Sequence, residues 1–104
     1  MKDKLIQIIE CFGINSQLKK LNEECYELIE AIRDYEDMYM KCDCDSQYLK
    51  NEKEHIEEEL ADMMVMLEQF ANYYEIDVNK ILKIAEKKVD RTIEIIENGY
   101  YKGE

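Results

Sequence analysis

The sequence contains no proline and only three glycines among its 104 residues. Proline ends or kinks a helix, and glycine is the next strongest helix breaker. A chain almost free of both can form long, uninterrupted helices where its apolar residues recur every three or four positions. That spacing recurs along most of the chain, and no segment alternates as a strand does. We therefore predict an all-α fold.

Turn signals divide this pattern into four helices. The expected elements are, in order, a helix over about Lys2–Phe12 ended by Gly13, a helix capped by Asn15 or Ser16 and running to about Met40, a connection over Lys41–Asn51, a helix over about Glu52–Tyr74, and a helix capped by Asp77 and ended by Asn98 and Gly99. The tail from Tyr100 to Glu104 should fray. The second and third helices should form an antiparallel hairpin inside a helical bundle, which we predict to be one domain over residues 1–104.

Each long helix carries a stripe of mostly apolar residues, and we expect the stripes of the second and third helices to pack together. The members are Leu18, Leu21, Cys25, Leu28, Ile32 and Tyr35 on the second helix, Ile56, Leu60, Met63, Leu67, Phe70 and Tyr74 on the third, and Ile81, Ala85, Val89, Thr92 and Ile96 on the fourth. Because a chain of this size buries a small share of its surface, a homo-oligomer, a dimer or a tetramer, is expected to complete the core.

The charge balance limits the kinds of partner. With 25 acidic residues against 14 Lys and Arg, the formal net charge is -11, which disfavours nucleic acids and anionic membranes. No apolar run approaches the ~20 residues of a membrane-spanning helix, and the first residues do not resemble a secretory signal. We expect a cytoplasmic protein, and one that binds a phosphorylated substrate only where cations offset the repulsion.

The four cysteines are expected to be structural. Cys11 and Cys25 lie in helical patterns as small core residues, whereas Cys42 and Cys44 form a close pair without the second pair of a structural zinc site.

Acidic residues form two short patterns beside the apolar stripes. Glu24 and Glu27 are three positions apart on the second helix, and Glu59 and Asp62 are three apart on the third, so each pair shares one helix face. If the two stripes pack together, the four carboxylates converge at the edge of the core. Such crowding is unfavourable unless a hard cation offsets it, and carboxylate oxygens suit Mg²⁺, with Mn²⁺ as the alternative. Acids scattered over solvated helix faces are the simpler interpretation.

The two acidic patterns, EExxE within LNEECYELIEAI and ExxD within EELADMMVML, together resemble those of a known family. The resemblance is to the MazG-like all-α nucleoside triphosphate pyrophosphohydrolases and extends from Ser16 to about Arg91. It implies Mg²⁺-dependent hydrolysis of a nucleoside triphosphate to the monophosphate and pyrophosphate. By the same resemblance, Glu24, Glu27, Glu59 and Asp62 are metal ligands, Glu23 is a secondary ligand or orients water, and a spare carboxylate, Glu23 or Glu27, accepts the proton of the attacking water.

Three cationic residues are candidates for binding the substrate phosphates. Lys20 lies four positions before Glu24, so it can reach a phosphate or simply pair with that carboxylate. Lys87 and Arg91 belong to a basic stripe on the fourth helix and are loose counterparts of basic residues that relatives carry after ExxD. A solvated face that pairs with the abundant acids is the alternative for this stripe.

Three further residues near the acidic patterns are weaker candidates for a role in the site. His55 shares a face with Glu59, and Glu52-x-x-His55 imitates half of a di-iron element, but the chain has no second histidine, so an exposed or substrate-contacting role is expected. Met66 and Tyr73 share the metal face and could line a base pocket or pack in the core. Met66 is not the aromatic residue that relatives often have.

Two hypotheses of different classes follow. The first is the pyrophosphohydrolase; the second is a helical oligomerisation or interaction module that keeps the fold without catalysis. The four ligand positions are all intact, which favours the enzyme.

Overall fold

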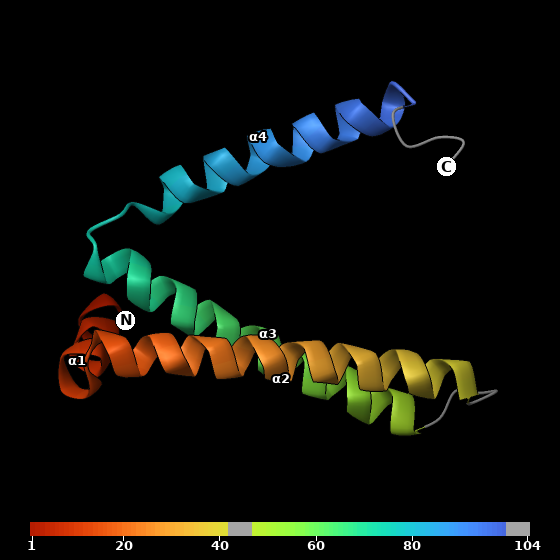
Figure 1. Cartoon of the computed structure of the whole chain (residues 1–104), viewed down its shortest axis with the longest axis horizontal. Coiled ribbons are helices and arrows are strands. Elements are labelled where there is room, and N and C mark those ends of the chain that lie inside the picture. The colour runs from red at the N-terminus through yellow and green to blue at the C-terminus, as the bar shows by residue number, and fades with distance from the viewer. Residues whose placement is uncertain (42–46, 100–104) are drawn as a thin grey trace.

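The computed structural model describes residues 1–41 and 47–99, which form four helices (Figure 1). They are α1 (Lys2–Phe12), α2 (Ile14–Lys41), α3 (Gln47–Tyr73) and α4 (Val78–Glu97). No strand occurs in these two ranges. The predicted all-α fold is confirmed.

The helix boundaries agree with the sequence except at the start of α2 and of α3. Gly13 adopts a φ of 87°, and its N–H donates to the Ile9 carbonyl, which ends α1 as predicted. The expected cap at Asn15 or Ser16 is wrong, because this left-handed turn lets α2 begin at once with Ile14.

The start of α3 was predicted five residues too late. Residues Gln47–Asn51, assigned to the connection, are helical, and the Gln47 amide donates to the Asn51 side chain at 3.1 Å. Polar side chains spaced four apart stabilise a helix that has no apolar stripe. Residues 42–46, with Cys42 and Cys44, and the tail from 100 to 104 lie outside the described residues.

Helices α2 and α3 lie side by side as the predicted antiparallel hairpin, and α1 packs mainly against α3 near the start of α2 (Figure 1). The core apolar residues that are fully covered are few: Leu5, Ile9, Ala31, Met66 and Ala71. Four polar side chains are buried with them: Gln17, Glu24, Glu59 and Gln69. An interface with so many buried polar groups needs a functional explanation.

The predicted packing of the two apolar stripes is only partly right. The Cys25 thiol does lie 3.9 Å from the Met63 sulfur. However, the buried positions of α2 are 17, 24 and 31, each one residue before a predicted stripe position. Leu18, Ile32 and Leu60 are 42–49% exposed as a result. A periodic pattern identifies the apolar side of a helix, but the edge that meets the neighbour is decided by packing.

The prediction that Cys11 and Cys25 are core residues is also only partly right. Cys11 is exposed, and Cys25 is half-buried against α3. Cys11 follows the last buried residue of α1, Ile9, by two positions, which is about half a helical turn and turns its side chain outward.

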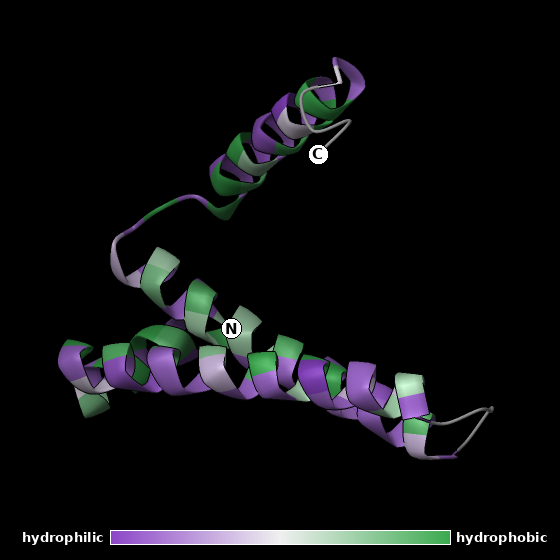
Figure 2. Cartoon of the chain, turned by 45° about the vertical axis from the view of Figure 1, so that its right-hand side comes forward, coloured by the Kyte–Doolittle hydropathy of each residue, from purple (hydrophilic) through white to green (hydrophobic). Residues whose placement is uncertain are grey.

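Helix α4 begins as predicted, because the Asp77 carboxylate accepts a hydrogen bond from the Asn79 N–H at 2.9 Å. It ends at Asn98, before Gly99. Over its whole length α4 projects away from α1, α2 and α3. It makes almost no contact with them, and none of its residues is buried in the described part of the chain (Figures 1 and 2). Within one chain, therefore, α1, α2 and α3 pack together, and the apolar side of α4 stays uncovered.

A membrane span is not found: none of the helices described in residues 1–41 and 47–99 is long and apolar enough to cross a bilayer.

Candidate metal centre

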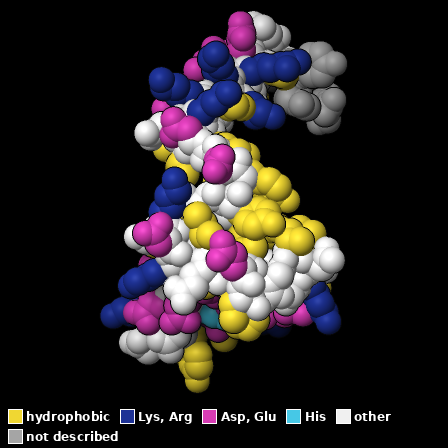
Figure 3. Space-filling model, turned by 90° about the vertical axis from the view of Figure 1, so that its left-hand side faces the viewer, with side chains coloured by type: hydrophobic (Ala, Val, Ile, Leu, Met, Phe, Trp, Pro, Cys, Tyr) yellow, Lys and Arg dark blue, Asp and Glu magenta, His cyan; other side chains and the backbone are white. Residues whose placement is uncertain are grey.

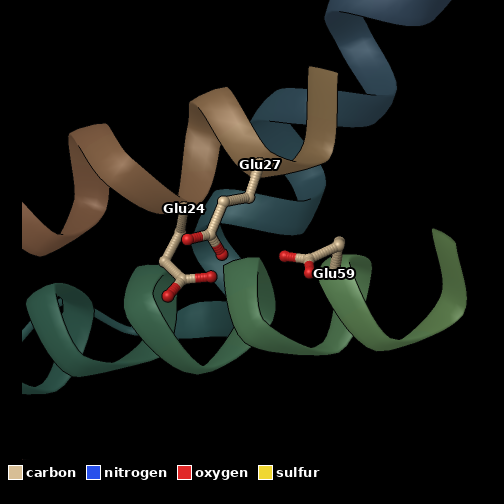
Figure 4. A group of neighbouring side chains, drawn as sticks. All are labelled: Glu24, Glu27 and Glu59. Atoms are coloured by element: carbon tan, nitrogen blue, oxygen red, sulfur yellow. The ribbon is translucent and has the colours of Figure 1, made fainter. Parts of the chain in front are cut away.

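Three carboxylates meet between α2 and α3. Glu24 and Glu27 extend from neighbouring turns of α2 toward Glu59 of α3 (Figure 4). One carboxylate oxygen of each residue lies within 4.8 Å of those of the other two. The spacing of three residues in the sequence places the first two on one face, and the antiparallel hairpin brings the third opposite them.

Two of these carboxylates are buried. Glu24 is 5% exposed and Glu59 is 8% exposed. The Oε2 atom of each is sealed from solvent and has no hydrogen-bond partner among the described residues. A buried carboxylate oxygen without a partner costs on the order of 1–3 kcal/mol or more. Two such atoms at one place indicate that a positively charged ligand belongs there.

The lysine and histidine side chains nearby satisfy only the other oxygens. Lys20 Nζ lies 3.2 Å from Glu24 Oε1, and His55 Nε2 lies 3.3 Å from Glu59 Oε1. Both partners are about half exposed, so they cover the outside of the cluster. The inward-facing Oε2 atoms stay available to a ligand held between the helices.

The electrostatics reflect the same crowding. The pKa of Glu27 is raised above its ordinary value, first by repulsion from Glu24, then by desolvation and by Glu59. The pKa of Lys20 is raised by its hydrogen bond to Glu24 and by that carboxylate's charge. The cluster thus attracts protons and cations, and a divalent ion would be the stronger competitor.

The remaining predicted site residues lie at different distances from this cluster. Asp62 does not belong to the converging group but lines a cavity that Glu24 also lines. Glu23 is exposed beside the cluster and contributes to the raised pKa of Lys20. Lys87 and Arg91 are exposed on α4, which makes almost no contact with α2 or α3 in the described chain. One chain alone therefore does not bring these two cations to the carboxylates.

The cavity beside the cluster has a volume of about 520 Å³, is open to solvent on one side and is lined by residues of α1, α2 and α3. Met66 lines it, as the sequence indicated, whereas Tyr73 does not and instead packs edge-on against Tyr74. Two other lining residues, Gln17 and Gln69, were missed by the sequence reasoning. Their signal was available: Gln17 precedes Glu24 by seven positions, so the two share a face.

The donor set of the cluster suits a hard divalent cation. Carboxylate oxygens are the only ligand atoms that converge in the described part of the chain, with no thiol and one imidazole that is already paired. Such ligands select Mg²⁺ or Mn²⁺ over softer metals. The two unpartnered Oε2 atoms show that the residues present fit such an ion.

A model of the MazG nucleotide pyrophosphohydrolase domain matches residues 12–95. The chain belongs to this family. No curated protein and no solved structure matches it significantly. The matched range contains α2, α3 and nearly all of α4, and with them both acidic patterns, so the resemblance seen in the sequence is confirmed. The family is one of nucleotide pyrophosphohydrolases that generally depend on a divalent metal, and the acidic cluster of this chain agrees with that.

Proposed function

We propose that this MazG domain, residues 1–104 as one unit, is an active, Mg²⁺-dependent pyrophosphohydrolase that acts on a cytoplasmic nucleoside or deoxynucleoside triphosphate. Water would attack the α-phosphorus, the bond to the bridging oxygen would break, and the products would be the monophosphate, pyrophosphate and one proton. The observation that supports this most directly is the convergence of Glu24, Glu27 and Glu59, with two oxygens buried and unpartnered.

Each residue of the centre has a distinct place in this proposal. Glu24, Glu27 and Glu59 would hold the cation, and Asp62 would join them from the cavity wall once a ligand is bound. When bound, the metal would neutralise phosphate charge and lower the pKa of water. Glu27, or Glu23 beside it, is exposed and can pass the proton of the attacking water to solvent. Lys20 stands at the outer edge, where it can exchange Glu24 for a phosphate oxygen.

An assay of pyrophosphate release over a panel of nucleoside triphosphates tests the proposal. Wild-type protein with Mg²⁺ should release pyrophosphate from at least one of them, and EDTA or Glu27→Gln should abolish release. Glu30→Gln, an exposed acid one turn further along α2, is the matched control and should leave the rate unchanged. No turnover on any nucleotide would overturn the proposal and favour the interaction module.

We further propose a homo-oligomer in which α4 packs onto another copy. Helix α4 exposes apolar residues on its uncovered side, among them Ile81, Leu82 and Val89. It carries five cations against four acids in a chain of net charge -11, and Lys and Arg side chains gather over it in Figure 3. A surface that fits it must be both acidic and partly apolar. The α2–α3 pair of a second copy meets both requirements, since its acids are numerous and Ile29, Ile32 and other apolar residues are exposed.

This packing would also explain how Lys87 and Arg91 bind substrate, namely in the site of a neighbouring copy. In a dimer, a mixture of Glu27→Gln and Arg91→Ala subunits should then regain about a quarter of the wild-type activity, because half of the dimers are mixed and each has one intact site. If the two inactive variants stay inactive after mixing, Arg91 either acts in the site of its own chain or does not bind substrate.

A further inference from the structure

The cavity of about 520 Å³ adjoins the carboxylate cluster through a shared residue. Glu24 belongs to both, and Asp62 and Lys20 line the cavity with it. The apolar walls come from α1 and α3: Ile8, Phe12, Val65 and Met66. A ligand that occupies this space would have an apolar, planar or compact part and would reach a cation at the cluster with its other end.

Two buried glutamines stand out in this apolar lining. Gln17 is 4% exposed and Gln69 is 2% exposed. The Gln17 amide donates to the Gln69 carbonyl at 2.9 Å, and the Gln69 amide in turn donates to the Met66 sulfur at 3.7 Å. Thioether sulfur is a weak acceptor, so the amide of Gln69 is only loosely satisfied. A ligand in the cavity could therefore offer this amide a stronger partner than sulfur.

The pair has hydrogen-bonding capacity left over. The Gln17 carbonyl accepts no hydrogen bond from the described residues, and each amide nitrogen donates one there, which leaves one N–H of each amide without a partner. Both side chains line the cavity, so a ligand held in it would lie beside this unused capacity. The Met66 sulfur sets the orientation of the Gln69 amide: it accepts from the N–H₂ group, so the Gln69 carbonyl is turned toward Gln17. The pair thus presents an acceptor beside donors.

We propose that Gln17 and Gln69 select the nucleobase of the substrate by hydrogen bonding to its polar edge, while its ring lies against Met66, Val65 and Phe12. The inference rests on the proposed function, because it assumes that the phosphates reach the carboxylate cluster. An amide that offers a donor next to an acceptor is the side-chain group that pairs with base edges in two places at once. Sites of this kind strongly reject analogues that leave their buried polar groups unpaired.

Binding of nucleosides to metal-free protein tests the inference independently of catalysis. Nucleosides have no phosphates and EDTA removes metal, so binding measured by NMR titration depends on the cavity alone. Wild-type protein should prefer one base over the others. Gln17→Met and Gln69→Met keep the side-chain length. Each should weaken binding of the preferred nucleoside by about tenfold, so that all nucleosides bind with similar affinity. Gln47→Met, an exposed glutamine of α3, should change nothing.

The possible results separate this inference from the proposed function. No nucleoside binding to wild-type protein, or an equal loss for every base in the two variants, would overturn the role of the pair. Turnover of nucleotides with an unchanged base preference in Gln69→Met would also overturn it and leave the hydrolase standing. Base-selective binding that these variants abolish, in a protein that releases no pyrophosphate, would support the pocket and remove the hydrolase.

Discussion

Helices α3 and α4 have opposite relations between sequence pattern and burial. Helix α3 buries a carboxylate and an amide, Glu59 and Gln69, while several of its large apolar residues are half exposed. Helix α4 has a clear apolar side, yet none of its residues is buried (Figure 2). The proposed metal site thus includes buried polar groups of α3, and the proposed contact with a second copy uses the uncovered apolar side of α4.

The difference follows from what each helix packs against. Helix α3 lies along α2, and charged and amide groups are buried at that contact, where protein partners leave one oxygen each of Glu24 and Glu59 unpaired. Helix α4 is separated from both by residues 74–77, where Glu75 adopts a positive φ of 56° and redirects the chain. The proposed metal site and the proposed oligomer contact thus lie in different parts of the chain, the first between α2 and α3 and the second on α4.

Removal of one buried carboxylate should have the largest effect. Glu24→Gln should lower pyrophosphate release by at least about a hundredfold, because a ligand is lost. The same change should leave the metal-free protein equally stable or more stable by about 1 kcal/mol, since removal of a buried carboxylate with one unpartnered oxygen offsets loss of the ion pair with Lys20. Activity and urea unfolding in EDTA are the measurements. A marked loss of stability would mean that Glu24 stabilises the hairpin rather than the ligand.

A charge on the apolar side of α4 should have the next largest effect. Val89→Glu should raise the dissociation constant of the oligomer by at least about tenfold and leave the helical content unchanged, because that side chain is 60% exposed within the chain. Light scattering after gel filtration, with circular dichroism, measures both. Asn79→Glu, which adds the same single charge to α4 at an exposed position outside the apolar stripe, is the matched control. If both variants associate as wild type does, α4 is not the contact.

Added metal should stabilise α2 and α3 together. At a hundred times its dissociation constant, Mg²⁺ should stabilise the folded chain by about 2.7 kcal/mol, which corresponds to a rise in Tm of several degrees. Glu59→Gln should lose most of this rise. Equal shifts in the variant and wild type would indicate non-specific screening of the net charge of -11.

The smallest expected effect is a pH dependence due to Glu27. Its pKa is raised in the folded chain by repulsion from Glu24, so the folded state binds a proton more readily than the unfolded state does. The repulsion therefore lowers stability at neutral pH and is relieved as the pH falls through the folded pKa, completely so below the ordinary value of 4.5.

In EDTA, the Tm of wild-type protein relative to Glu27→Gln should consequently rise between pH 7 and pH 5. Glu30→Gln is the control for the general loss of charge. Parallel Tm curves for wild type and Glu27→Gln would contradict the assigned repulsion.

The local features of this protein were legible in its sequence. The lack of proline led to long helices, Gly13 to the end of α1, and Asp77 to the cap of α4, because each acts through its own backbone or the next few residues. The pairing of Glu24 with Glu27 follows from helical spacing alone.

Tertiary packing decided which residues of each helix meet another helix, which the spacing in the sequence does not determine. It turned α2 by about one residue, so that Gln17, Glu24 and Ala31 are buried while the apolar stripe is only partly covered. It brought Glu59 to the cluster but left Asp62 at the cavity wall, and it paired Gln17 with Gln69 across 52 positions. A helical period defines a side of a helix about a hundred degrees wide. Which edge of that side meets a neighbour depends on contacts between distant segments, which no local pattern encodes.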